Sequence, residues 1–332
     1  MPAFEETFSR FCGVRYGVAT SNGTTALHLA LVVLGVGPGD EVIVPTLTFV
    51  ATANAVHYTG ATPVFADSEP ETWNLDPEDV RRRITPRTKG IIPVHLYGHP
   101  ADMDPILEIA REHGLWVLED AAEAHGARYK GRRVGSLGRM ACFSFYGNKI
   151  ITTGEGGMIL TDDAELAEKA AWLRDHGMSR EKRYWHPVIG FNYRMTNIQG
   201  ALGLGQMERI DAILQKKQDI ARWYREGLAG VPGLVLSPQA EWAETVYWMY
   251  SVLVTDAFGM GRDDLMAALR EAGIDTRPFF YPIHTMPPYA RGERFPVAEE
   301  LAARGINLPS GLGLTEEQVR YICETIRQLG RG

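Results

Sequence analysis

The sequence predicts an α/β protein in which a large domain with a mainly parallel sheet is followed by a smaller α+β domain. From residue 17 to about residue 175, short apolar runs rich in β-branched residues alternate with segments whose apolar residues recur at helical spacing. A long helical stripe follows, and a shorter set of strand and helix patterns closes the chain. These observations favour one parallel sheet joined to a second, smaller structural unit.

Seven runs in the first part have the length and composition of strands: residues 17–20, 41–44, 62–66, 90–96, 115–119, 141–145 and 158–161. Between them lie five segments with helical periodicity: residues 24–36, 49–58, 77–84, 104–113 and 164–176. Strands that alternate with helices form parallel sheets covered on both faces. Ligands of such sheets bind at the carboxyl ends of the strands, so residues that follow a strand are the first candidates for a site.

The second part begins with a helix whose apolar residues are spaced by three or four: Leu204, Met207, Ile210, Leu214, Ile220, Trp223, Tyr224 and Leu228. The Pro232-Gly233 pair ends this pattern. Beyond it, residues 247–254 predict a strand, and residues 263–272 and 315–328 predict helices. We therefore expect a large domain over residues 1–215 and a small domain over residues 216–332.

Composition excludes several classes of protein. The 332 residues are 45% hydrophobic and 23% charged, as expected for a globular chain with an ample core. A net charge of −7 argues against a nucleic-acid-binding surface. No apolar run reaches membrane-spanning length, and the N-terminus does not resemble a signal peptide. The three cysteines match no disulfide or metal spacing, so we expect a cytoplasmic protein without a metal. The lack of a long apolar run adds the expectation that it has no membrane partner.

The most informative pair of residues is Asp120, at the end of a predicted strand, and Lys149, in a polar, glycine-rich turn. A lysine amine can form a covalent C=N link with an aldehyde, and a buried carboxylate can hold a ring nitrogen protonated. Pyridoxal 5′-phosphate (PLP) requires both groups. Taken alone, the pair could also be a strand-end carboxylate and a solvated surface lysine.

Two further segments follow predicted strands. Residues 21–27 join a strand to a helix with small and hydroxyl side chains, which suits either a phosphate-binding site or an ordinary helix cap. Phe49 could stack on a flat ring or belong to the core. Residues 190–199 form a polar cluster that could cap a helix or reach into a site. His95 and His99 are spaced as in a helical zinc site, but Gly98 and Pro100 disfavour a helix there.

Together these segments resemble the nucleotide-sugar aminotransferases of PLP fold type I. The motifs that carry the resemblance are residues 119–124 (EDAAEA), 144–149 (SFYGNK), 153–157 (TGEGG) and 191–195 (FNYRM). The resemblance implies that Lys149 binds PLP covalently and that Asp120 pairs with its ring nitrogen. It also implies a set of cofactor-binding residues: Gly23, Thr24, Thr25 and Ser144 at the phosphate, Phe49 and Ala122 on the ring faces, Glu123 near the phenolic oxygen, and Asn192 from a second subunit.

Finer likenesses, in residues 94–98, 184–199 and 277–289, point to members that act on GDP-4-keto-6-deoxymannose. The resemblance then implies that L-glutamate loads the cofactor as its pyridoxamine form and that the sugar C4 ketone takes the amine. Tyr281 and His284 are candidate residues for the sugar nucleotide, and Arg194 is a candidate for the donor carboxylate on charge alone. A dTDP- or UDP-linked ketosugar, or a non-catalytic regulatory protein that keeps the fold, remain alternatives.

The role of Asn192 implies a homodimer with shared active sites. Relatives generally carry an additional segment ahead of the first helix, which residues 4–11 represent here. We expect its absence to affect substrate affinity, stability or activity.

Overall fold

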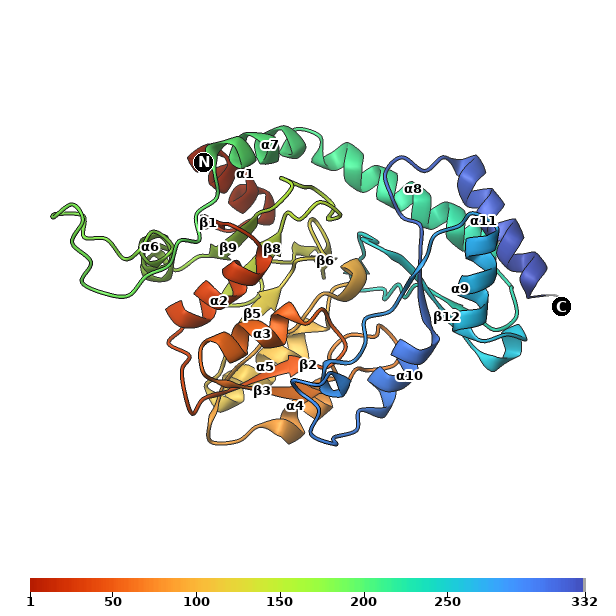
Figure 1. The fold of residues 1–332 in the computed structure, drawn as a ribbon, viewed down its shortest axis with the longest axis horizontal. Helices are drawn as coiled ribbons and strands as arrows, with labels where there is room; N and C mark the ends of the chain where they lie inside the picture. Colours follow the sequence, from red (N-terminus) through yellow and green to blue (C-terminus); the bar gives the residue numbers. More distant parts are fainter. Residues whose placement is uncertain (331–332) are drawn as a thin grey trace.

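The computed structural model describes residues 1–330 and contains two main sheets joined by a long helix, α8 (Ile210–Leu228) (Figure 1). The larger sheet has seven strands in the order β1-β9-β8-β5-β4-β2-β3. Strand β9 runs antiparallel to both of its neighbours, and the remaining pairs are parallel. The prediction of a mainly parallel seven-stranded sheet is therefore confirmed. Its strands are β1 (Tyr16–Thr20), β2 (Glu41–Pro45), β3 (Thr62–Ala66), β4 (Thr88–Ile91), β5 (Trp116–Asp120), β8 (Met140–Ser144) and β9 (Gly157–Thr161).

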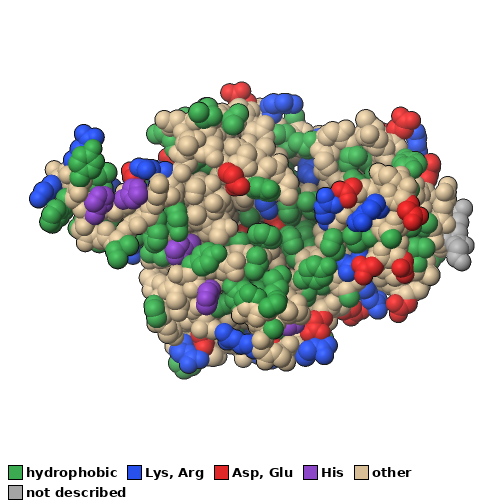
Figure 2. Space-filling model, in the orientation of Figure 1, with side chains coloured by type: hydrophobic (Ala, Val, Ile, Leu, Met, Phe, Trp, Pro, Cys, Tyr) green, Lys and Arg blue, Asp and Glu red, His purple; other side chains and the backbone are tan. Residues whose placement is uncertain are grey.

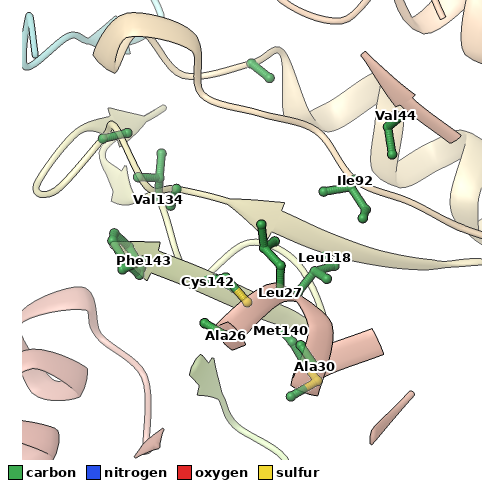
Figure 3. Packing of buried hydrophobic residues seen from close by; sticks show 14 of the residues in the cluster. Ala26, Leu27, Ala30, Val44, Ile92, Leu118, Val134, Met140, Cys142 and Phe143 are labelled. Carbon is green, nitrogen blue, oxygen red and sulfur yellow. The ribbon is translucent and has the colours of Figure 1, made fainter. Parts of the chain in front are cut away.

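Every residue of β2, β8 and β9 is buried, because helices cover both faces of this sheet. Helix α2 packs on β1, β8 and β9, α3 and α4 pack on β3, and α5 packs on β4 and β5. Figure 3 shows Ala26, Leu27 and Ala30 of α2 facing Met140 and Cys142 of β8. The helices are α1 (Pro2–Cys12), α2 (Gly23–Val33), α3 (Ala51–Tyr58), α4 (Pro77–Arg83), α5 (Met103–His113), α6 (Ala164–Leu173) and α7 (Asn197–Met207), with a short 3₁₀ helix η1 (Leu96–Gly98).

The smaller sheet is antiparallel, in the order β10-β12-β14-β13, and the last helices pack beside it. A third sheet of three short strands, β11-β6-β7, links the two parts. The remaining elements are β6 (Arg128–Tyr129), β7 (Arg132–Arg133), β10 (Leu234–Leu236), β11 (Ala243–Glu244), β12 (Tyr250–Val254), η2 (Asp256–Phe258), α9 (Arg262–Glu271), β13 (Arg277–Pro278), η3 (Ile283–Thr285), α10 (Pro296–Arg304), β14 (Gly305–Leu308) and α11 (Glu316–Leu329).

Buried apolar residues form two separate clusters. One lies around the large sheet, and the other begins at Ile220 and is built from α8, α9, α11 and the small sheet. The segment from Phe279 to Ala302 packs on the first cluster, although it belongs to the second half of the chain. The division into domains 1–215 and 216–332 stays a prediction.

Two predicted elements differ from the structure. The continuous helical stripe from Leu204 to Leu228 is two helices, α7 and α8, because Arg209 leaves the helical region with φ −115° and ψ 6°. The run predicted as a strand over residues 90–96 ends at Ile91, and the chain then turns through η1, where Tyr97 has φ 53°. The break between α7 and α8 contains no proline, so the sequence pattern gave little warning of it. The end of β4 did carry a signal, because Pro93 follows it by two residues and a proline has no N–H to donate to a strand ladder.

The helices of residues 1–330 were compared with the length and hydropathy that a membrane span needs, and none of them meets both.

Candidate functional site

A cleft of about 490 Å³ opens at the carboxyl edge of the large sheet. Residues at or just after the ends of β1, β2, β5 and β8 line it, together with Val94, Trp248 and Phe280. Figure 2 shows the molecule hollowed between its two parts, with hydrophobic side chains gathered around the hollow. This is the edge at which parallel sheets bind ligands.

Asp120 lies at the base of the cleft, at the end of β5. Its carboxylate accepts a hydrogen bond of 2.7 Å from the Thr52 hydroxyl and one of 3.2 Å from the Ala122 amide. Burial raises the pKa of Asp120, while these two bonds and the nearby Lys149 amine act in the opposite direction. The neighbouring Glu119 points the other way and bonds to His95, so the two adjacent carboxylates do not share a site.

The Lys149 amine faces the same cleft and is mostly buried, with 12% of the side chain exposed, beside an aromatic ring and a carboxylate. Its Nζ lies 3.8 Å from the centroid of the Trp248 ring and 3.8 Å from Oε1 of Glu123. Burial lowers the pKa of Lys149, and Glu123 and Asp120 partly offset this effect. A lysine held in this way loses its proton more readily than a surface lysine, as a nucleophilic amine must. The alternative of a solvated surface lysine is wrong.

Glu123 is buried beside Lys149, and its Oε2 accepts a hydrogen bond of 2.8 Å from the Tyr97 amide. Burial raises the pKa of Glu123 to about 7, despite the opposing influence of Lys149 and of the Tyr97 N–H. Near neutral pH this carboxyl group can therefore hold or release a proton within the cleft.

The shifted pKa of Glu123 makes the stability of the cofactor-free protein depend on pH. The folded protein keeps a proton that the unfolded chain loses near pH 4.5, so the contribution of Glu123 is fully present below that pH and is lost as the pH rises through about 7. We expect wild type to lose on the order of 2 kcal/mol relative to Glu123→Gln between pH 4.5 and pH 8. Urea unfolding of both proteins across this range measures the difference. A constant difference would mean that the pKa of Glu123 is the same in the folded and the unfolded protein.

The N-terminus of α2 also lines the cleft. Asn22 caps this helix in a capping box, in which its side chain accepts from the Thr25 amide and Thr25 Oγ1 accepts from the Asn22 amide. The amides of Gly23 and Thr24 have no helical carbonyl a turn earlier and lie on the cleft. A helix N-terminus with open amides favours an anion such as phosphate. Thr25 both caps the helix and lines the cleft.

Gly23 is required by close packing. A Cβ at this position would lie 2.8 Å from the Cβ of Ser144, which also lines the cleft. We expect Gly23→Ala to destabilise the fold by about 1–3 kcal/mol and to weaken binding of a phosphorylated ligand. Gly37→Ala, at a glycine with no atom within 4 Å of the added Cβ, is the matched control. Thermal unfolding and PLP titration of both variants test this, and equal effects of the two changes would refute it.

Comparison with known proteins identifies the family. The sequence matches the DegT/DnrJ/EryC1/StrS aminotransferase family over residues 1–327. The chain belongs to this family. It is 52% identical to GDP-perosamine synthase of Caulobacter vibrioides over 98% of this chain and 89% of that protein. The structure of Streptomyces venezuelae DesV superposes with a TM-score of 0.94 at 40% identity, over 100% of this chain and 89% of that one. A putative sugar aminotransferase of Streptococcus pneumoniae, Spr1654, solved in its PLP form, superposes with a TM-score of 0.94 at 30% identity, over 99% and 90% of the two chains.

These matches confirm the predicted family, fold type and enzyme class of the aminotransferase. Its cleft also fits PLP on its own evidence. Open amides suit the phosphate, an amine of lowered pKa suits the aldehyde, and a buried carboxylate at Asp120 suits a protonated ring nitrogen. Phe49 and Ala122 line the cleft, as a flat ring between two walls requires. Eight predicted residues of the aminotransferase therefore line one cleft together with Lys149: Gly23, Thr24, Thr25, Phe49, Asp120, Ala122, Glu123 and Ser144.

The other predicted residues do not line this cleft in their own subunit. Asn192 and Arg194 bond to one another, and Arg194 forms an ion pair of 2.5 Å with Asp175. Tyr281 is exposed beside Phe280, which does line the cleft. His284 is buried, with Nδ1 bonded to the Thr46 hydroxyl and Nε2 to Glu299, so both ring nitrogens are already used within the chain. The roles of these four residues stay predictions.

Thr52, Tyr97 and Trp248 are among the contributors to the aminotransferase site that were missed from the sequence. Thr52 lies one helical turn after Phe49, so the periodicity of α3 could have indicated it. The backbone N–H of Tyr97 reaches Glu123 from a residue with positive φ, and no local sequence pattern predicts positive φ for a tyrosine. Trp248 comes from the second half of the chain and reaches Lys149 through tertiary packing alone.

Proposed function

We propose that this aminotransferase transfers an amino group from L-glutamate to C4 of GDP-4-keto-6-deoxymannose and forms GDP-perosamine, with PLP as its cofactor. The observation that carries the proposal is the mostly buried Lys149 amine beside Glu123, in a cleft that Asp120 and the N-terminus of α2 also line. The choice of sugar nucleotide is supported by the likeness to the Caulobacter vibrioides GDP-perosamine synthase.

PLP supplies an electron sink and a carrier for the amino group. Each neighbouring residue then has a defined task. Lys149 would hold the cofactor covalently, and its amine would move the proton at Cα of the donor. Asp120 would keep the ring nitrogen protonated, and Glu123 can hold a proton beside Lys149. The α2 amides and Ser144 would bind the phosphate.

Turnover with a panel of ketosugars tests the proposal. The purified protein, loaded with PLP and supplied with glutamate, is offered the GDP-, dTDP- and UDP-linked 4-keto-6-deoxysugars. We expect 2-oxoglutarate and an amino sugar from the GDP substrate, detected by mass spectrometry. Turnover of the dTDP or UDP substrate alone would assign the alternative sugar nucleotide. PLP binding without turnover of any ketosugar would favour the regulatory alternative.

We also propose a homodimer in which each subunit completes the cleft of the other. Residues 178–190 project from the body as an arm (Figure 1), and this arm and α7 carry exposed apolar side chains, among them Trp185, Ile189, Ile198 and Leu202. Asn192 follows this arm and lies outside the cleft of its own subunit. Light scattering of the purified protein measures its mass in solution, and a monomer at working concentration would remove the proposed role of Asn192.

A further inference from the structure

One lysine interrupts the apolar stripe of α8. The buried residues of this helix are spaced by three or four, and all are apolar or aromatic except Lys217, which lies between Ile213 and Ile220. Ile213 belongs to the hydrophobic cluster of the large sheet, and Ile220 belongs to that of the small sheet. Figure 1 shows α8 running between the two parts of the molecule. Lys217 therefore lies where the helix passes from one core to the other.

The Lys217 amine is held by two backbone carbonyls, those of Trp248 and Ser310, each at 2.7 Å. Within residues 1–330, no carboxylate lies at ion-pair distance from this amine. Burial lowers the pKa of Lys217 to about 7. Burial of an amine without a counter-charge is unfavourable, and a methionine would fill the same volume in an apolar stripe. Something other than packing then favours lysine at this position.

The contact with Trp248 connects Lys217 to the catalytic amine. The indole Nε1 of Trp248 donates a hydrogen bond of 2.7 Å to the carbonyl of Asn148, the residue before Lys149. The face of the same indole lies 3.8 Å from the Lys149 Nζ. Trp248 is thus held at two points: its backbone carbonyl accepts from the Lys217 amine, and its indole N–H donates to the carbonyl of Asn148. The Lys149 amine lies against the indole ring.

We propose that Lys217 is a positioning residue, which holds Trp248 at the joint between the two cores so that the indole fixes and shields the Lys149 amine. The proposal rests on the role of Lys149 in the proposed function. If it is right, loss of the Lys217 amine loosens the indole, admits water to Lys149 and misplaces its Nζ. If Lys217 only joins the two cores, its loss lowers stability and leaves Lys149 as it was.

Lys217→Met removes the amine and keeps the apolar stem. The matched control is Gln218→Met on the same helix, because Gln218 donates to the carbonyl of Thr245 in the segment that leads to Trp248. The first readout is the rate at which acetic anhydride labels Lys149 in the full-length, PLP-free protein, measured by peptide mass spectrometry against pH. We expect Lys217→Met to raise the midpoint of this profile by about one pH unit, because water stabilises the charged amine, and Gln218→Met to leave it unchanged.

The second readout is turnover by the PLP-loaded protein. Misplacement of the amine is expected to lower kcat about tenfold and to change KM for glutamate much less. A Lys217→Met profile and kcat equal to those of Gln218→Met, with only thermal stability reduced, would overturn the proposal. If Lys217→Met does not fold, Trp248→Phe tests the next link, since it keeps a ring but loses the bond to Asn148. An unchanged labelling profile in that variant would also overturn the proposal.

The two readouts separate this proposal from the proposed function. The labelling profile needs neither PLP nor a sugar nucleotide, so it remains valid if wild type turns over no ketosugar. Normal turnover by wild type together with a normal Lys217→Met variant would remove the positioning role alone.

Discussion

Replacement of Lys149 by alanine is expected to lower amino transfer by at least about 10³-fold, because the only amine in the described cleft that can bind the cofactor and move the donor proton is lost. The fold should tolerate the change. Burial already lowers the pKa of this amine, so its removal relieves the cost of keeping a charge away from water. We therefore expect a folded protein that retains phosphate contacts with PLP and has no covalent link to it.

Borohydride reduction followed by peptide mapping measures this directly. In wild type the reduced cofactor should be found on the peptide that contains Lys149, and in Lys149→Ala it should be absent. Lys89→Ala, which changes an exposed lysine that pairs only with Asp40, is the control and should behave as wild type. Trapping of the cofactor on another lysine of the wild-type protein would contradict the assignment of the site.

Most of the cleft could be predicted because its residues follow strands. Asn22 and Gly23 follow β1, Phe49 follows β2, and Asp120 and Ser144 end β5 and β8. In a parallel sheet these positions meet at one edge, so alternation of strands and helices is enough to bring them together. Adjacent strand residues point to opposite faces, so Glu119 points away from the cleft that Asp120 lines.

The residues that escaped prediction reach the site across the fold. Trp248 and Lys217 come from the second half of the chain. The contact of Trp248 with Lys149, and that of Lys217 with Trp248, depend on how the two cores are joined. His284 is buried against Phe295 with both ring nitrogens bonded within the chain, and its role toward a sugar nucleotide stays a prediction. Local sequence carries no information on either arrangement.

Asp120→Asn is the most selective test of how the site uses charge. Asparagine has the same shape and can still bond with Thr52, but a neutral amide cannot keep a positive ring nitrogen paired. Breaking a buried charge pair costs about 3–5 kcal/mol, so we expect turnover to fall by about 10²–10⁴-fold. PLP affinity should fall in the same variant.

The stability of the cofactor-free protein gives the contrasting result. Burial raises the pKa of Asp120, which means that an ionised carboxylate in the site without PLP lowers the free energy of unfolding. Cofactor-free Asp120→Asn should therefore unfold at a temperature equal to or above that of wild type, while the PLP-loaded variant should unfold below loaded wild type. Thermal unfolding of the four samples measures both differences. Thr52→Val is the control, because it removes a hydrogen bond from the carboxylate and leaves its charge. A carboxylate that serves the protonated ring nitrogen of PLP stabilises the protein only when PLP is bound. If Asp120→Asn lowered the unfolding temperature equally with and without PLP, Asp120 would therefore serve the fold and not the cofactor.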